Sequence, residues 1–169
     1  LYPDEIEKID SNVAIKKLDK TKVIIGAAES MSKSKKNTID PEDMINKYGA
    51  DAVRWFILSD SPPEKDIQWS ATGVAASNKF LQKIWNLNHT INSRKEQKSV
   101  KEIEEQFLKA INNYINKIDV SIKNFRFNVS IASFYEIYNL FKNYINKEIN
   151  SYLLKQNMIK IMKLMIPFT

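Results

Sequence analysis

The sequence predicts a mainly α-helical protein, in which a helical bundle is preceded by a small β-hairpin and a polar loop. Apolar residues recur every three or four positions over most of residues 103–165, which is the spacing of a buried helix face. Two short β-branched runs lie near the start of the chain. A cationic stretch without apolar periodicity separates them from the first helix signal.

Composition fits one folded domain or two small ones. The 169 residues are 43% hydrophobic, which is enough to bury a core. No apolar run approaches the roughly 20 residues that span a bilayer, so we expect no membrane partner. The chain has no cysteine, which excludes disulfides, thiolate metal sites and cysteine nucleophiles within it and fits a cytoplasmic location.

The net charge of +6 is concentrated in the C-terminal half. Residues 92–169 contain 13 Lys and Arg against seven Asp and Glu, whereas the rest of the chain is neutral overall. Such an excess favours a polyanion partner such as RNA, because cations near phosphates release counterions. A solvated lysine-rich surface explains the same excess, and charge alone leaves both interpretations open.

The first segment is interpreted as a β-hairpin. Its β-branched runs, residues 12–17 and 22–25, are joined by Leu18-Asp19-Lys20-Thr21, a polar connection suited to a turn. Residues 26–29 lead into Ser30-Met31-Ser32-Lys33-Ser34-Lys35-Lys36-Asn37, which is small, polar and cationic. That composition predicts a loop.

Two short helices are expected next. Asp40-Pro41-Glu42-Asp43 is a strong helix start, because Asp caps free amide groups, Pro fits the first turn and acidic residues complement the positive helix end. This helix should end at Gly49. A second helix is predicted for residues 50–58, ended by the prolines at 62–63. Its inward side is expected to comprise Val53, Phe56 and Ile57.

Longer helices follow. One is predicted from about residue 70 to residue 91, and a polar linker then occupies residues 92–98. Three further helices suggest a bundle, with a break at Phe127-Asn128-Val129 between the first two. We interpret their apolar stripes as core rather than as base-stacking platforms. The stripes are Ile103, Phe107, Ile111, Tyr114, Ile118, Ile122 and Phe125; Ile131, Phe134, Tyr138, Phe141 and Ile145; and Leu154, Met158, Ile161 and Met165.

The loop is the segment that carries chemistry. Lys33, Lys35 and Lys36 are interleaved with Ser32 and Ser34 just before a helix start. Several cations and hydroxyl donors on one loop could hold a triphosphate and stabilise charge on a pyrophosphate leaving group. A merely solvated loop has the same composition, so the residues alone leave both interpretations open.

The wider string resembles the KMSKS region of class I aminoacyl-tRNA synthetases. The resemblance rests on residues 31–37, then Ile39-Asp40-Pro41, then Tyr48-Gly49-Ala50-Asp51-Ala52-Val53-Arg54. In that family the loop closes over ATP and its second lysine contacts the phosphates. The resemblance implies that Lys33 is the catalytic residue. The implied ATP-binding set is Ser30, Met31, Ser32, Lys33, Ser34 and Lys35.

One residue departs from the family pattern. The family's first loop lysine is Ser30 here, so one expected cation is missing. Lys35 and Lys36 are the neighbouring lysines that could take over its duty. A slower activation step is the other consequence to consider.

The amino-acid specificity is read from residues 58–69, with the run Ser-Pro-Pro-Glu-x-Asp-x-x-Trp, followed by Gly73, Phe80-Leu81 and Ile84-Trp85. This stretch resembles leucyl-tRNA synthetases. The valyl, isoleucyl and methionyl families share the loop but not this run. Residues 127–132 and 165–169 resemble the helical anticodon-binding domain of the class.

The resemblance implies a C-terminal-side piece of an enzyme that uses leucine, ATP and Mg²⁺ and charges tRNA(Leu), expected to be a monomer. The expected parts are a hairpin segment at 1–29, the loop with stem-contact helices at 30–91, and an anticodon-binding bundle, truncated at its C-terminus, at 92–169. No metal ligand is assigned, and the piece alone is expected to be inactive. The alternatives are a free-standing RNA-binding helical module, a purely structural bundle, or a synthetase for valine, isoleucine or methionine.

Three further residues are interpreted as structural. Arg54 and Trp55 lie on a short helix and are expected to pack there, with Arg54 pairing with Asp51 or Asp66. His89, the sole histidine, lies near a helix end without an evident partner and is expected on the surface.

Overall fold

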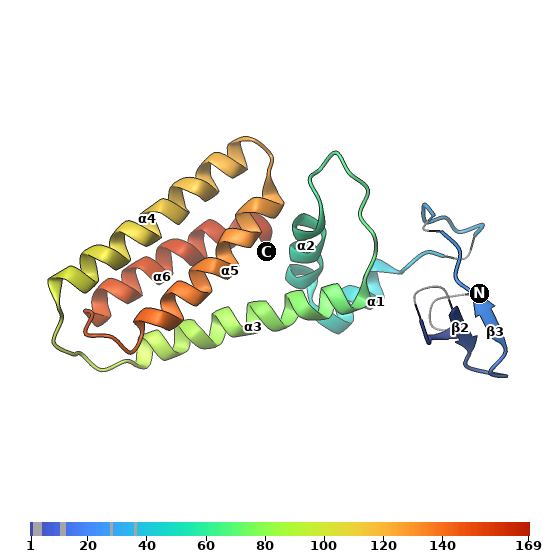
Figure 1. Cartoon of the computed structure of the whole chain (residues 1–169), viewed down its shortest axis with the longest axis horizontal. Helices are drawn as coiled ribbons and strands as arrows, with labels where there is room; N and C mark the ends of the chain where they lie inside the picture. The colour runs from blue at the N-terminus through green and yellow to red at the C-terminus, as the bar shows by residue number, and fades with distance from the viewer. Residues whose placement is uncertain (2–4, 11–12, 28, 36) are drawn as a thin grey trace. The chain divides into compact units, whose positions relative to one another are not determined.

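The chain folds into two compact units, Leu1–Met44 and Ile45–Thr169. The predicted mainly α-helical class is confirmed, with a small sheet near the N-terminus and helices over most of the remainder (Figure 1). This is a computed structural model, and the residues that it describes are 1, 5–10, 13–27, 29–35 and 37–169.

The first unit contains a three-stranded antiparallel sheet in the order β1-β2-β3. Its strands are β1 (Ile6–Lys8), β2 (Val13–Lys16) and β3 (Lys22–Ile24). The predicted hairpin of β2 and β3 is confirmed, although its first expected residue, Asn12, lies outside the described residues. Strand β1 was not predicted, because Ile6-Glu7-Lys8 has no β-branched run and joins the sheet through main-chain pairing with β2.

Helix α1 (Pro41–Tyr48) begins and ends as predicted. The Asp40 carboxylate accepts a hydrogen bond from the Glu42 N–H at 2.9 Å, which satisfies one of the free amide groups of the first turn. Gly49 follows the helix with φ 84°, a conformation that favours glycine, and its N–H donates to the Ile45 carbonyl at 2.8 Å.

Helix α2 (Ala50–Asp60) buries a different side from the predicted one. Phe56 is buried as expected, but Ile57 is 41% exposed and Val53 is only half-buried. The buried residues are Ala52, Trp55 and Phe56. The reason is tertiary: α2 packs against α3 and α5 on the side that carries the indole of Trp55, and one residue along a helix rotates the facing side by about 100°.

Four long helices and a final short turn complete the second unit (Figure 1). They are α3 (Ala71–Ser93), α4 (Lys101–Lys123), α5 (Phe127–Tyr144), α6 (Ser151–Met165) and the 3-10 turn η2 (Ile166–Phe168). The break between α4 and α5 lies at residues 124–126, because α5 already includes Phe127. Phe125, predicted on the α4 stripe, occupies this turn with φ 55° and is 65% exposed.

The other predicted stripes supply the core of the bundle. None of the helices in the described residues combines the length and the apolar character that a bilayer crossing requires. The fully buried stripe residues include Phe107, Ile111, Ile118, Ile131, Phe134, Phe141, Leu154, Met158 and Ile161. The interpretation of these residues as core is therefore confirmed.

Arg54 and Trp55 are structural, as predicted. Trp55 is fully buried. The Arg54 guanidinium donates to the Pro167 carbonyl at 3.0 Å. The expected pairing of Arg54 with Asp51 or Asp66 is wrong, because the guanidinium bonds η2 instead. His89 is exposed on α3, as expected.

Arg94 holds the linker after α3 against the turn between α5 and α6. Its guanidinium donates to the carbonyls of Ile145 at 2.8 Å, Ile149 at 2.7 Å and Lys147 at 2.8 Å. It also donates to the Ser151 hydroxyl at 2.6 Å. These carbonyls belong to the end of a helix and a turn, where no helical partner is available, so one planar cation satisfies several acceptors at once; the Lys147 carbonyl also accepts from the Ile149 N–H at 2.8 Å.

We therefore expect Arg94→Lys to destabilise the second unit by about 2 kcal/mol, because an ammonium cannot reach the same set of acceptors and leaves part-buried carbonyls unpaired. Urea denaturation followed by circular dichroism measures the change. Arg126→Lys is the matched control, since Arg126 is exposed and its side chain has no hydrogen-bond or ion-pair partner among the described residues. Equal midpoints for the two variants would contradict the role of Arg94.

Candidate functional site

The candidate site is the loop between β3 and α1, and its centre is a β-turn. The Lys35 N–H donates to the Ser32 carbonyl at 3.2 Å, which closes a four-residue turn with Lys33 and Ser34 at its two central positions. Serine suits the first position of such a turn, and no apolar residue within it favours burial. The sequence therefore gives a short polar turn with a lysine at its tip.

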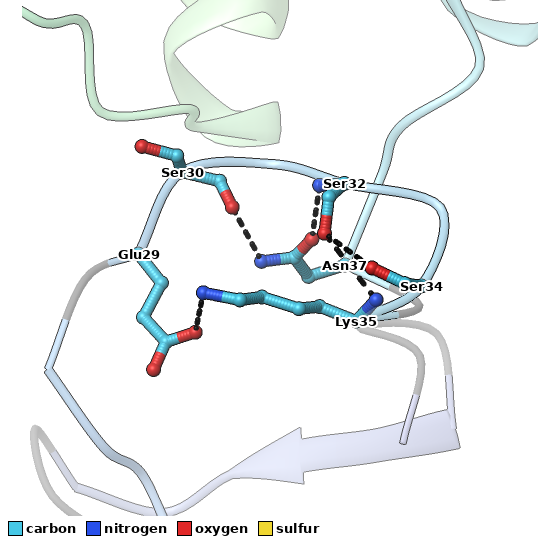
Figure 2. Close-up of polar contacts among 6 residues, drawn as sticks. All are labelled: Glu29, Ser30, Ser32, Ser34, Lys35 and Asn37. Carbon is cyan, nitrogen blue, oxygen red and sulfur yellow. Dashed lines mark hydrogen bonds and ion pairs between the residues drawn. The ribbon is translucent and has the colours of Figure 1, made fainter.

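The side chain of Asn37 closes the loop around this turn (Figure 2). Its Oδ1 accepts from the Ser32 N–H at 2.8 Å, and its Nδ2 donates to the Ser30 carbonyl at 3.3 Å. Asparagine side chains commonly make such local bonds to the main chain in turns. The chain before the turn is thus joined to the chain after it.

Hydroxyl groups line the same turn. The Oγ atoms of Ser32 and Ser34 lie 3.2 Å apart, within hydrogen-bond distance. The Lys35 N–H also approaches the Ser32 Oγ at 3.3 Å. The two serine hydroxyls are therefore neighbours on one small surface, where either can rotate its proton toward an incoming acceptor.

The two described lysines of the loop are in different situations. Lys35 Nζ lies 2.7 Å from Glu29 Oε2, and both side chains are more than half exposed. The hydrogen bond from Lys35 and its positive charge hold the pKa of the Glu29 carboxyl below its ordinary value. Lys33 is exposed and has no ion-pair or hydrogen-bond partner among the described residues.

The structure brings together most of the residues that the sequence suggested. Ser32, Ser34 and Lys35 are directly bonded, and Ser30 joins them through its carbonyl. Met31 is 47% exposed beside them. Lys36, the second lysine considered as a substitute for the missing cation, lies outside the described residues. Sequence reasoning assigned no role to Asn37 or Glu29, although an asparagine just after a serine-rich loop is a known signal for a side-chain to main-chain bond.

The loop can bind an anion but offers little to a cation. A lysine without an ion-pair partner among the described residues, on a turn that also carries two serine hydroxyls, suits phosphate oxygens. Within the described residues no group of three or more His, Cys, Asp or Glu side chains is arranged to hold a metal ion. The two described carboxylates that flank the loop are engaged, Glu29 with Lys35 and Asp40 as the cap of α1.

A second polar surface lies on the helical unit. A groove of about 300 Å³ between α3 and α5 is lined by Lys83, Asn86, Thr90, Tyr138 and Lys142, together with Leu87 and Ile145. The Lys142 ammonium lies 5.8 Å from the centre of the Tyr138 ring. Two ammonium groups with amide, hydroxyl and phenol donors form a surface that suits a polyanion.

Comparison with known proteins identifies relatives for nearly the whole chain. Residues 20–70 match the family of class I tRNA synthetases (I, L, M and V). A leucine–tRNA ligase of Bartonella tribocorum is 39% identical over 148 residues, 84% of this chain and 16% of the relative. A leucine–tRNA ligase of Rickettsia bellii is 41% identical over 148 residues, 88% of this chain and 17% of the relative. The chain thus spans about a sixth of the length of these relatives.

The fold has a counterpart among solved structures. A crystal structure of the ternary complex of Agrobacterium radiobacter K84 agnB2 LeuRS with tRNA and LeuAMS superposes on 82% of this chain with a TM-score of 0.71. The sequence identity is 23%, and this chain covers 18% of that chain. The likeness confirms the fold of the chain.

The Glu29–Lys35 pair gives a pH prediction. The pKa of Glu29 is lowered in the folded loop, so the ion pair is intact at any pH above the ordinary glutamate range. As pH falls through that range the pair persists, and it is lost only at more acid pH. We expect the Glu29 side-chain carbon to titrate below the ordinary glutamate range in a carbon-detected NMR experiment. In Lys35→Ala it should return to the ordinary range, and an unchanged midpoint in that variant would contradict the assigned cause.

Proposed function

We propose that this chain is a segment of a class I tRNA synthetase, a leucine–tRNA ligase, and that it carries the ATP-phosphate loop and a tRNA-binding helical bundle. One observation carries the proposal. The loop inside the segment that matches the family places Lys33, an ammonium without a partner among the described residues, at the tip of a turn lined by serine hydroxyls. That arrangement suits the phosphates of ATP.

The loop would act in the activation of the amino acid. A carboxylate oxygen of leucine attacks the α-phosphorus of ATP, the new O–P bond forms, and the bond from the α-phosphorus to the bridging oxygen breaks to release pyrophosphate. Negative charge grows on the leaving pyrophosphate, and the Lys33 ammonium would stabilise that charge. No covalent bond to the protein is needed. A hydroxyl of the tRNA 3′-terminal ribose then attacks the carbonyl carbon of the adenylate; the new ester C–O bond forms, the bond from that carbon to the phosphate oxygen breaks, AMP leaves and the hydroxyl proton is released.

Other loop residues would bind rather than react. We assign Ser30, Met31, Ser32, Ser34 and Lys35 to the ATP-binding surface with Lys33. Lys35 would reach the phosphates by leaving Glu29, since an exposed ion pair is easily exchanged for a more highly charged partner. Mg²⁺ would be held mainly by the phosphates, because the described residues contain no group of three or more His, Cys, Asp or Glu side chains arranged to hold a metal ion.

The helical unit would contact tRNA(Leu). The net charge of the chain is +6, and the groove between α3 and α5 presents Lys83 and Lys142. We infer that residues 30–91 carry the loop and stem-contact helices, and that residues 92–169 form the anticodon-binding bundle after the hairpin segment at 1–29. The parent enzyme would be a cytoplasmic monomer, and this segment alone would be inactive because it supplies a single part of the ATP site.

Lys33→Ala in the full-length enzyme should reduce leucine-dependent exchange of pyrophosphate into ATP by about 100-fold in kcat/KM, the usual effect of removing one donor to developing charge. Isoleucine, valine and methionine should support little exchange in either protein. Lys22→Ala, which removes an exposed lysine on β3, is the control for general charge loss. Exchange driven by a different amino acid would overturn the leucine specificity, and no exchange at all would favour an RNA-binding module without catalysis.

Replacing both Lys83 and Lys142 by Gln should weaken tRNA(Leu) binding several-fold and reduce the salt dependence of the association constant, because two phosphate-facing cations are lost. Filter binding at several salt concentrations measures both quantities. A double Gln variant at Lys8 and Lys22, on the two outer strands of the sheet, removes the same charge elsewhere. If both double variants behave alike, the groove has no specific role in tRNA binding.

A further inference from the structure

We propose that Asn37 is a positioning residue for Lys33: its carboxamide joins Ser30 to Ser32 and thereby fixes the turn whose tip carries the lysine. The inference rests on the proposed function, in which Lys33 meets the phosphates of ATP. It adds a residue that touches neither the nucleotide nor the reacting atoms and acts through the conformation of the loop.

A continuous set of hydrogen bonds links Asn37 to the turn (Figure 2). The Asn37 Oδ1 accepts from the Ser32 N–H at 2.8 Å. The carbonyl of the same Ser32 accepts from the Lys35 N–H at 3.2 Å, and this bond closes the turn. Ser32 is therefore held at both of its main-chain polar groups, and Lys33 is the next residue along the chain. With the backbone fixed, only the side-chain freedom of Lys33 remains to be ordered when it meets a ligand.

The chemistry of a carboxamide suits this position. The same planar group must accept from an N–H at Ser32 and donate to a carbonyl at Ser30, where Asn37 Nδ2 lies 3.3 Å from the oxygen. A carboxylate would lose the donor and repel the Ser30 carbonyl, and alanine would lose both bonds. Asn37 is half-buried, whereas Lys33, Ser34 and Lys35 are exposed, and its bond from the Ser32 N–H is part-buried, so that bond is better shielded from water than the tip of the turn.

The two hydrogen bonds of Asn37 also explain how the loop keeps its shape with a serine at residue 30, where the KMSKS pattern has its first lysine. Residue 30 is held through its carbonyl, which every residue type has, and the Ser30 side chain has no hydrogen-bond partner among the described residues. The exchange of lysine for serine therefore removes a charge without removing a bond that shapes the loop. The conformation of the turn, which Asn37 fixes, therefore does not depend on the charge of the side chain at residue 30.

The test is a double-mutant cycle in the full-length enzyme, measured as the ATP kcat/KM of leucine-dependent pyrophosphate exchange. Asn37→Ala alone should lower this value about tenfold, the equivalent of roughly one to two net hydrogen bonds. In a Lys33→Ala background the same substitution should cause no further loss, because the group that Asn37 positions is already gone. Should that background fall below detection, Lys33→Gln replaces it; the positioned charge is again absent, and no further loss is expected.

Two readouts separate positioning from general damage. Transfer of leucine from preformed leucyl-adenylate to tRNA should be unchanged in Asn37→Ala, because that step does not use the ATP phosphates, and the melting temperature should also be unchanged. Asn92→Ala is the matched control. That carboxamide likewise makes two hydrogen bonds, to the carbonyl and side chain of Asn88, but it lies on α3 in the other unit.

The outcomes distinguish the two proposals. An unmodified enzyme without leucine-dependent exchange, or Lys33→Ala with full exchange, would remove the proposed function itself. With that function intact, the inference fails if Asn37→Ala exchanges at the unmodified rate, if its loss multiplies with that of Lys33→Ala, or if transfer from the adenylate falls equally.

Discussion

The packing of Trp55 is the interaction on which the helical unit depends. Its indole is fully buried, with ring centres 5.4 Å from Phe80, 5.7 Å from Phe134 and 6.4 Å from Phe168. These partners come from α3, α5 and η2, so one side chain of the short helix α2 contacts three other elements. Burying a tryptophan in such a setting stabilises a fold by about 3–5 kcal/mol relative to alanine.

The polar end of the same side chain is also satisfied. The indole N–H donates to the Tyr135 hydroxyl at 3.3 Å, and the Tyr135 ring in turn lies 3.9 Å, centre to centre, from Phe80. A buried donor without a partner would cost free energy, so the tyrosine makes the burial of tryptophan possible.

The loop is stabilised in another way. Between Glu29 and Asn37 the described residues are exposed or half-buried, and the contacts are single hydrogen bonds and one exposed ion pair. Such contacts each contribute little, so the loop has low local stability compared with the aromatic core of the bundle. A segment that closes over a ligand needs low local stability. The hydrogen bonds of Asn37 hold the main chain of the turn, so the remaining conformational freedom lies in the side chains of the turn.

How much the sequence revealed depended on whether the deciding contacts were local. The cap of α1 by Asp40, the stop at Gly49 and the cap of α3 by Ser70 involve residues within a few positions of one another, and all were predictable from local rules. The β-turn and the lysine at its tip lie within a segment that composition marked as a loop.

The features that sequence reasoning missed depend on distant partners or on atomic geometry. The buried side of α2 is set by α3 and α5, so Ile57, as apolar as its neighbours, faces outward. Arg54 bonds a carbonyl 113 positions away, where the sequence suggested a nearby carboxylate. Asn37 was visible in the sequence, but its bonds depend on the path of the chain around Ser32, which composition does not specify.

The charge of the loop follows from the same geometry. Residue 30 is a serine, and Lys35 is neutralised by Glu29 in the structure, so Lys33 is the described loop lysine that presents an uncompensated charge. A triphosphate carries more charge than a carboxylate and would compete for Lys35, since the pair with Glu29 is exposed to water and screened by salt. Glu29 would then keep the second cation within the loop until a nucleotide arrives. A loop that lacks one lysine could in this way still offer two ammonium groups to the phosphates, one permanently and one by exchange.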